Sequence, residues 1–263
     1  MALIAVLLPT HKPKDYLERC FKSLDAQTLP KNKFCIYIAL NGPREEYEIY
    51  IHAILYEFNF HYKYIYLNKP SVSHARNHLI EISSEPYITF MDDDDVVSSN
   101  YLESLLEQAD EKFIAISNVC NFTENIENLT PNYMGLAFNR LSNKEISKLK
   151  IRKFFSSSCG KLIHRNIIGT TRFDTKLTAG EDSLFMTELS HRVVGVKKTD
   201  SSACYYVYER PGSTTRSKVN KWREIKRINY LLWKYSFMMF GRQDKLFVLS
   251  RIAATMKHVK RLF

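Results

Sequence analysis

The chain has 263 residues, of which 45% are hydrophobic and 25% are charged, a composition typical of a globular protein with a sizeable core. Its five cysteines are odd in number and show no Cys-x-x-Cys spacing, which argues against a disulfide framework or a zinc ribbon and favours a reducing cytoplasm. The net charge of +10 is concentrated at one end, because residues 214–263 hold 13 Lys and Arg against two acidic residues.

The first nine residues are apolar, but they lack the basic leader and the longer apolar run of a signal peptide. They predict a buried first strand instead. No stretch elsewhere approaches the roughly 20 apolar residues that a membrane-spanning helix needs. We therefore expect a protein that does not cross a membrane by itself.

Apolar runs and helical patterns alternate along the first half of the chain. Strands are predicted at residues 3–8, 34–40, 63–67, 87–91 and 113–117. Apolar residues spaced as in one face of a helix predict helices around residues 17–24, 47–58, 75–82 and 102–109. This alternation indicates βαβ units, and therefore an α/β fold with a mostly parallel sheet and helices on both faces.

The periodicity weakens after residue 119. Residues 119–150 are polar and rich in Asn, and they predict loops with one short helix. A helical stretch is predicted again at residues 183–190, and residues 203–209 alternate as a late strand does.

Polar residues follow three of the predicted strands directly. In parallel sheets, ligands bind at the carboxyl ends of the strands, so we expect these segments to face one crevice. The segments are Pro9-Thr10-His11, Asn41-Gly42 and the run Asp92, Asp93, Asp94 and Asp95.

The four consecutive aspartates repel one another unless a cation or basic groups compensate them. Mg²⁺ or Mn²⁺ shared between carboxylates and a diphosphate would do so, because both ions prefer oxygen ligands and substrate phosphates. The alternative is a solvated turn that caps the next helix. The position of the run at the end of a strand favours the metal site.

Two later segments are candidates for the same site. Gly180-Glu181-Asp182 begins a predicted helix, where the acidic side chains either complement the helix dipole or supply a general base. Residues 208–215 form a strand end and a turn in which Arg210 and hydroxyl groups could bind phosphates, although such a turn is also an ordinary loop.

The order of these motifs resembles that of family 2 glycosyltransferases with the GT-A fold, particularly the bacterial enzymes of O-antigen and capsular polysaccharide assembly. The resemblance spans about residues 3–215 and implies a GT-A domain over residues 1–215, with a Rossmann-like sheet flanked by helices. The motifs are Val6-Leu-Leu-Pro-Thr-His11, Ser73-His-Ala-Arg-Asn77, residues 87–95, Cys159-Gly-Lys-Leu-Ile-His-Arg165, Gly180-Glu-Asp182 and Arg210-Pro-Gly-Ser213.

The resemblance also implies a role for each candidate residue. Asn41 stands where many members carry an aspartate that binds the uracil, so the hydrogen-bonding side chain is kept and a charge is lost. Arg210 would neutralise the departing diphosphate. Contacts with the nucleotide sugar are implied for Pro9, Thr10, His11, Asn41, Arg76, Asp92, Asp93 and Arg210.

The same resemblance implies a metal and a base. Asp94 would bind Mn²⁺ or Mg²⁺ directly, with Asp92 near the metal or the ribose, and Asp182 would be the general base beside Glu181. Candidates for orienting the donor or the acceptor are Asp95, Lys161 and Ser213. The implied reaction is an inverting transfer of a hexose, with glucose or galactose favoured, from a UDP-sugar to an undecaprenyl-diphosphate-linked sugar.

Residues 216–263 combine basic and large apolar side chains and predict a basic amphipathic helical tail. Such helices with tryptophan are typical of membrane-surface elements, so one expectation is peripheral association with the inner face of the cell membrane, which faces the cytoplasm. The other is that the tail packs on residues 1–215 and that its charges are only solvated. The two are compatible.

The main alternative is a basic nucleic-acid- or membrane-binding protein without transferase activity, suggested by a pI of about 9.2. No nucleic-acid-binding motif occurs, and the aspartate run would repel phosphates without a metal, so we expect no nucleic-acid partner. A nucleotidyltransferase would need a Gly-rich phosphate loop near the N-terminus, and residues 9–13 do not form one.

Overall fold

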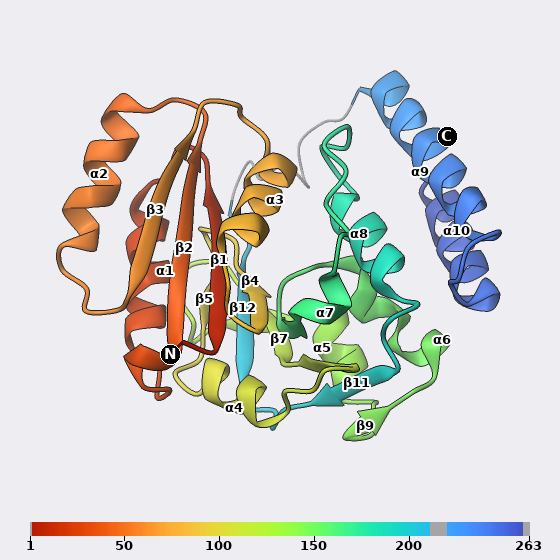
Figure 1. Cartoon of the computed structure of the whole chain (residues 1–263), viewed down its shortest axis with the longest axis horizontal. Coiled ribbons are helices and arrows are strands. Elements are labelled where there is room, and N and C mark those ends of the chain that lie inside the picture. The colour runs from red at the N-terminus through yellow and green to blue at the C-terminus, as the bar shows by residue number, and fades with distance from the viewer. Residues whose placement is uncertain (1, 211–219, 260–263) are drawn as a thin grey trace.

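A computed structural model describes residues 2–210 and 220–259 of the chain (Figure 1). The strands are β1 (Ile4–Thr10), β2 (Phe34–Asn41), β3 (Tyr62–Leu67), β4 (Tyr87–Phe90), β5 (Val96–Val97), β6 (Phe113–Ile116), β7 (Asn118–Phe122), β8 (Leu129–Pro131), β9 (Lys144–Glu145), β10 (Lys161–His164), β11 (Gly195–Lys198) and β12 (Cys204–Tyr208).

The helices follow the strands through most of the chain. The α-helices are α1 (Asp15–Asp25), α2 (Glu45–Leu55), α3 (Val72–Ile82), α4 (Tyr101–Glu107), α5 (Tyr133–Phe138), α6 (Lys148–Ile151), α7 (Arg165–Ile168), α8 (Glu181–Leu189), α9 (Lys221–Met238) and α10 (Lys245–Val259). Two 3₁₀ helices are η1 (Lys31–Lys33) and η2 (Arg152–Ser156).

The main sheet has eight strands in the order β3-β2-β1-β4-β10-β6-β11-β9. The first four strands are parallel, and β10 runs antiparallel to both of its neighbours. Helices α1 and α2 lie on one side of the parallel strands and α3 on the other (Figure 1). The α/β fold with a mostly parallel sheet, as predicted from the sequence, is confirmed.

The apolar runs form the central strands because helices cover both faces of the sheet. Every residue of β1 and β2 is buried, as expected for strands that contact helices on both sides. Helix α1 buries Leu17, Cys20, Phe21 and Leu24, whose spacing predicted its apolar face.

The topology brings three polar segments to one edge of the sheet. Strand β1 lies between β2 and β4, and all three run parallel, so their carboxyl ends converge. The Asn41 side chain donates to the Thr10 carbonyl at 2.8 Å, and the Thr10 hydroxyl donates to the Asp93 carboxylate. The prediction that these segments lie together is confirmed.

A second sheet, in the order β5-β12-β7-β8, lies beside the aspartate run. The prediction of loops with one short helix for residues 119–150 is wrong in part, because this range contains α5, the start of α6, β8, β9 and most of β7. Strand β7 buries only Val119 and Phe122, and its other side chains include Asn118 and Asn121. Backbone pairing with β8 and β12, rather than an apolar pattern of its own, stabilises this strand.

The two C-terminal helices pack against each other and against α8. Their shared apolar cluster consists of Leu177, Leu184, Leu231, Tyr235, Met238 and Val248. The expectation that the tail packs on the body is confirmed, whereas membrane association stays a prediction. Within residues 2–210 and 220–259, no helix is both long enough and apolar enough to span a bilayer.

We predict that Leu231→Ala lowers the free energy of unfolding by about 2–4 kcal/mol, because Leu231 is 4% exposed and its removal leaves a cavity between α8 and α9. Leu246→Ala is the matched control, since Leu246 is 65% exposed and its loss should cost less than about 0.5 kcal/mol. Urea denaturation measures both. Equal losses would contradict the packing of α9 on the body.

Candidate functional site

A buried arginine connects the aspartate run to the start of α8. Arg76, on α3, is only 2% exposed. Its Nη2 donates to Asp92 Oδ1 and its Nη1 to Asp182 Oδ1, both at 2.7 Å. Burial disfavours its charge, but Asp182 and Asp92 outweigh burial and raise the pKa of Arg76. Two segments 90 residues apart in the chain, at Asp92 and Asp182, are therefore held by one guanidinium.

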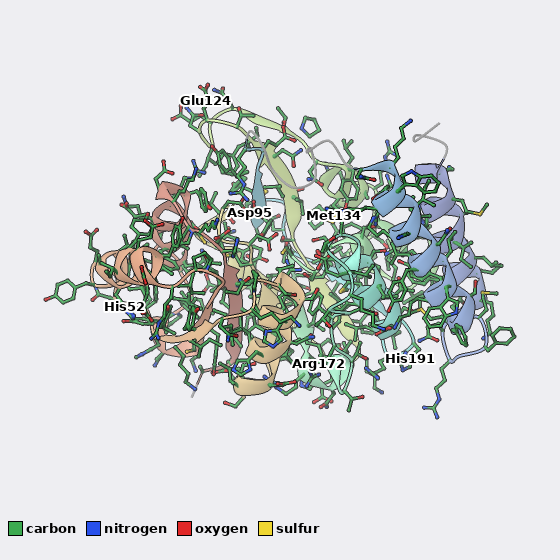
Figure 2. All side chains as sticks on the ribbon, turned by 90° about the horizontal axis from the view of Figure 1, so that it is seen from above. His52, Asp95, Glu124, Met134, Arg172 and His191 are labelled. Carbon is green, nitrogen blue, oxygen red and sulfur yellow. The ribbon has the colours of Figure 1, made fainter. Side chains whose placement is uncertain are left out.

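Each remaining aspartate of the run has a different partner. Asp93 accepts a hydrogen bond from Thr10, and Asp94 lies 3.0 Å from Arg210 Nε. Asp95 is 4% exposed and accepts from the backbone N–H of Tyr208 at 2.8 Å. Figure 2 shows Asp95 near the middle of the molecule, between its two halves. Asp95 thus ties the run to β12, and orientation of a substrate by Asp95 stays a prediction.

The run holds more negative charge than these partners balance. Burial, with the neighbouring aspartates adding to it, raises the pKa of Asp93 to about 7 and that of Asp94 to about 6. The same causes raise the pKa of Asp95. A cation that reaches the run would lower these pKa values, because a nearby opposite charge favours the charged form of a carboxyl group.

The acidic residues fit a hard divalent cation only if a substrate completes its coordination. Among residues 2–210 and 220–259, no group of three or more His, Cys, Asp or Glu side chains is placed to hold a metal alone. Mg²⁺ and Mn²⁺ commonly take one or two carboxylates together with phosphate oxygens. Asp92 and Asp94, with side chains 43% and 17% exposed, are suited to such a shared site.

Asp182 lies in the first turn of α8 with one oxygen engaged. Its Oδ1 accepts from Arg76 and, at 3.0 Å, from the Ser158 hydroxyl, and its side chain is 22% exposed. No donor in the described part of the chain bonds to Oδ2. Gly180 precedes the helix with φ of +81°, and a Cβ there would lie 2.9 Å from Arg227. The turn therefore requires glycine, and it presents a fixed carboxylate with one open oxygen.

Glu181 is more enclosed than Asp182. Its side chain is 12% exposed and lies 3.7 Å from Arg76 Nη1. Burial, with the charge of Asp182 adding to it, raises the pKa of Glu181. Glu181 is thus less accessible than Asp182, and its contact with a donor or an acceptor stays a prediction.

The loops after β1 and β2 are tied together. Pro9 is buried within β1, and the His11 ring contacts the Asn41 carbonyl. A Cβ on Gly42, which has φ of +117°, would lie 2.5 Å from the His11 ring, so this position also requires glycine. Asn41 is 3% exposed and accepts from the Ser71 N–H at 3.1 Å, which joins α3 to both loops. Recognition of a base by Asn41 stays a prediction.

Lys161 is 1% exposed and donates to the carbonyls of Ser157 and Cys159 at 2.8 and 2.6 Å. Burial lowers the pKa of Lys161 to about 8. Its contacts support the backbone next to Asp182, and a direct contact with a substrate stays a prediction. Ser213 lies outside the residues that the structure describes.

Three residues of the site were not predicted from the sequence. The Tyr205 hydroxyl accepts from the Asp92 N–H at 3.1 Å, and Ser158 bonds to Asp182. The guanidinium of Arg19 lies 4.9 and 4.4 Å from the ring centres of Phe122 and Tyr208. The serine run directly before Cys159-Gly-Lys was a signal for Ser158, whereas Arg19 and Tyr205 had none.

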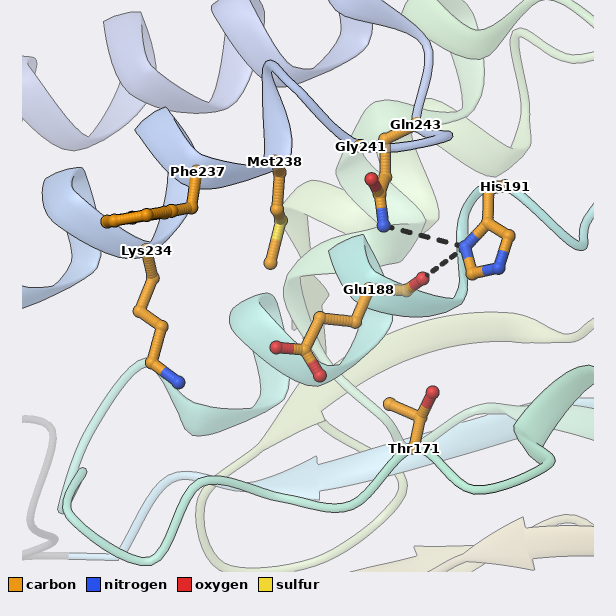
Figure 3. Close-up of a pocket in the computed structure, with 8 residues that line it drawn as sticks. All are labelled: Thr171, Glu188, His191, Lys234, Phe237, Met238, Gly241 and Gln243. Atoms are coloured by element: carbon orange, nitrogen blue, oxygen red, sulfur yellow. Dashed lines mark hydrogen bonds between the residues drawn. The ribbon is translucent and has the colours of Figure 1, made fainter.

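A separate cavity of about 380 Å³ lies near the C-terminal end of α8. Figure 3 shows its lining, which is Thr171, Glu188, His191, Lys234, Phe237, Met238, Gly241 and Gln243. None of the candidate residues lines it, so it does not belong to the acidic site.

Curated proteins similar to this chain are glycosyltransferases. Glycosyltransferase GlyA of Streptococcus pneumoniae serotype 4 (strain ATCC BAA-334 / TIGR4) is 28% identical over 237 residues, which cover 83% of this chain and 32% of GlyA. Glycosyltransferase GlyG of the same strain is 28% identical over 124 residues, which cover 46% of this chain and 40% of GlyG. The chain thus spans less than half the length of either relative.

Solved structures share the fold at low sequence identity. Residues 1–349 of TarS from S. aureus, in complex with UDP-GlcNAc, match with a TM-score of 0.76 at 17% identity, over 97% of this chain and 72% of that one. Mannosyltransferase PcManGT from Pyrobaculum calidifontis, in complex with GDP-Man and Mn²⁺, matches with a TM-score of 0.67 at 12% identity, over 95% of this chain and 69% of that one. These matches show the GT-A fold.

The family assignment rests on the sequence itself. The model of Glycosyl transferase family 2 matches residues 5–171, which is more than half of the chain. The chain therefore belongs to glycosyl transferase family 2.

Proposed function

We propose that this chain transfers a hexose from a UDP-sugar to a sugar linked to a lipid diphosphate, with inversion at the anomeric carbon. The observation that carries the proposal is the position of Asp182, which has an open Oδ2 and is joined through Arg76 to the aspartate run. The TarS structure holds UDP-GlcNAc on the same fold, which supports a nucleotide-sugar donor here.

Two residues of the chain have separate roles in a single displacement at the anomeric carbon. Asp182 accepts the proton of the attacking hydroxyl as the new bond to the anomeric carbon forms and the bond to the β-phosphate oxygen breaks. Arg210, 3.0 Å from Asp94, provides positive charge for the departing diphosphate. A divalent cation held by Asp94 and Asp92 would add Lewis-acid stabilisation of that leaving group.

We propose glucose or galactose as the transferred hexose and an undecaprenyl-diphosphate-linked sugar as the acceptor, in the assembly of a surface polysaccharide. The more specific O-antigen role, with its link to lipopolysaccharide, stays a prediction from the motifs. We also propose that residues 1–215 act as the transferase domain and residues 216–263 as the basic tail.

The tail offers a surface for a membrane that presents such an acceptor, at its cytoplasmic face. Four aromatic side chains of α9 and the turn after it are exposed, namely Trp222, Trp233, Phe237 and Phe240. Exposed basic residues lie among them, namely Lys221, Arg223, Lys226, Arg242 and Lys245. Aromatic rings at the headgroup level and cations near anionic lipids both favour binding, at about 1 kcal/mol for each cation.

Turnover tests the transferase proposal. With Mn²⁺, a panel of UDP-sugars and a synthetic sugar-diphosphate-lipid, we expect UDP release from one donor and its loss in EDTA. Asp182→Asn should lower kcat by about 10²–10⁴-fold, because the general base is removed. Asp94→Asn should abolish the response to Mn²⁺.

Glu107→Gln is the matched control, because Glu107 is an exposed carboxylate on α4 outside the site. Its kcat should equal that of the parent. Release from no donor, together with no UDP binding, would refute the transferase proposal.

The raised pKa of Asp93 predicts a pH-dependent gain in stability for Asp93→Asn in metal-free protein. The folded-state pKa of about 7 lies above the ordinary 3.8. The carboxyl therefore destabilises the folded state increasingly as the pH rises between these two values. The variant should gain roughly 1–2 kcal/mol at pH 8 and almost nothing at pH 4. Urea denaturation at both pH values measures this, and an equal gain at both would contradict the burial of a charged Asp93.

Membrane binding can be followed without a label, since both tryptophans of the chain, Trp222 and Trp233, lie on α9. We expect anionic vesicles to shift their emission to shorter wavelength, and salt to weaken the effect. Phe240→Ser should reduce binding, whereas Tyr56→Ser, at an equally exposed aromatic directly after α2, should not. An unchanged spectrum with anionic vesicles would overturn the membrane proposal.

A further inference from the structure

The segment of residues 156–160, here called the serine segment, lies against Asp182. The Ser158 hydroxyl donates to Asp182 Oδ1 at 3.0 Å. At the end of the segment that leads into β10, the Gly160 carbonyl accepts a hydrogen bond at 3.1 Å from the N–H of Ser117, which follows β6. Lys161 Nζ bonds to two carbonyls of the segment, as described above. The direction of the Asp182 carboxylate therefore depends on where this segment lies.

A residue of α10 fixes the other end of the serine segment. Arg251 is 3% exposed, and its Nη1 donates to the Ser156 hydroxyl at 3.0 Å, across 95 residues of sequence. The contact is reinforced by packing, because the Phe247 ring lies 5.5 Å from the guanidinium and stacks edge-on against Phe155. Helix α10 thus reaches the active-site side of the body through Arg251 and Phe247.

The charge and the N–H groups of the buried Arg251 guanidinium have few partners. Its Nε and Nη2 have no hydrogen-bond partner, and no carboxylate pairs with it, among the residues that the structure describes. Burial lowers the pKa of Arg251 to about 10. Packing alone would be served better by an apolar side chain of similar volume, because an unpaired buried charge costs free energy. The hydrogen bond to Ser156 is what an arginine adds at this position.

We propose that Arg251 is a positioning residue that acts through Ser156 and the serine segment to hold the Ser158–Asp182 hydrogen bond. The inference rests on the proposed function in that Asp182 is the general base. Helix α10, although it belongs to the basic tail, then supports the catalytic site of residues 1–215. Removal of the Arg251 contact should let the segment shift and leave Asp182 Oδ1 bonded to Arg76 alone.

The first test compares kinetics in the full chain. Arg251→Met should lower kcat about tenfold with the KM for the UDP-sugar unchanged, because the donor-side aspartates are untouched. Arg251→Lys, which keeps a cation and a donor, should recover part of the loss. Ser158→Ala should lower kcat to a similar extent, and the double variant should lose little more, since both changes break one chain of contacts.

The matched control is Arg140→Met, at an exposed arginine after α5 that belongs neither to the acidic site nor to the basic tail. Its kcat should equal that of the parent. A kcat for Arg251→Met equal to that of the control, or fully additive losses in the double variant, would overturn the proposal. If Arg251→Met does not fold, Ser156→Ala removes the same hydrogen bond without removing the buried cation, and its kcat decides.

A measurement that needs no activity separates this inference from the proposed function. Amide hydrogen exchange of residues 157–161 should be faster in Arg251→Met than in Arg140→Met, with residues 34–41 of β2 unchanged. If exchange is faster in Arg251→Met but the parent chain releases UDP from no donor, Arg251 still positions the serine segment and the transferase proposal is rejected. Unchanged exchange with an active parent enzyme would retain the transferase and reject the positioning role.

Discussion

Six carboxylates lie close together at one edge of the sheet, and the buried charge of Arg76 compensates the repulsion between the two acidic segments. The aspartate run contributes four of them, and Glu181 and Asp182 contribute two. Burial, with Coulomb repulsion adding to it, raises the pKa of several members, so the cluster is stabilised by positive charge. Arg76 supplies that charge with two hydrogen bonds of 2.7 Å, one to each acidic segment. Its rigid planar fork can hold two carboxylates at once, which a lysine could not do in the same way.

This constraint explains why the site is assembled from distant parts of the chain. The parallel strands β1, β2 and β4 bring the Thr10, Asn41 and Asp92 regions to one edge. Helix α3 lies on the opposite side of the sheet from α1 (Figure 1). It carries Arg76, which bonds to Asp92. Strand β12 then adds Tyr205, and the residues after it add Arg210, beside the aspartate run. No single segment can form the site alone.

The sequence allowed prediction of those features that depend on local pattern. The apolar runs predicted the central strands, and polar residues after them predicted where Thr10, Asn41 and Asp92 meet. Strand β7 escaped prediction because its partners, not its own side chains, determine its structure. The bridge from Arg76 to Asp182 and the contact of Ser158 with Asp182 also escaped, because a sequence does not state which side chains face each other across 106 and 24 residues.

Helix α10 was expected as part of a separate tail, yet it has two different faces. The buried face holds Phe247, Val248 and Arg251. Phe247 and Arg251 contact Phe155 and Ser156 of the body, and Val248 lies in the apolar cluster shared with α8 and α9. The opposite face exposes Leu246, Leu249 and Met256. Arg251 follows Val248 by three positions and Phe247 by four, which places all three on one face of a helix. This spacing was the one sequence signal of the arrangement. Because one rigid helix carries both faces, any partner that displaced α10 from outside would also displace Arg251, and with it the segment that holds Asp182.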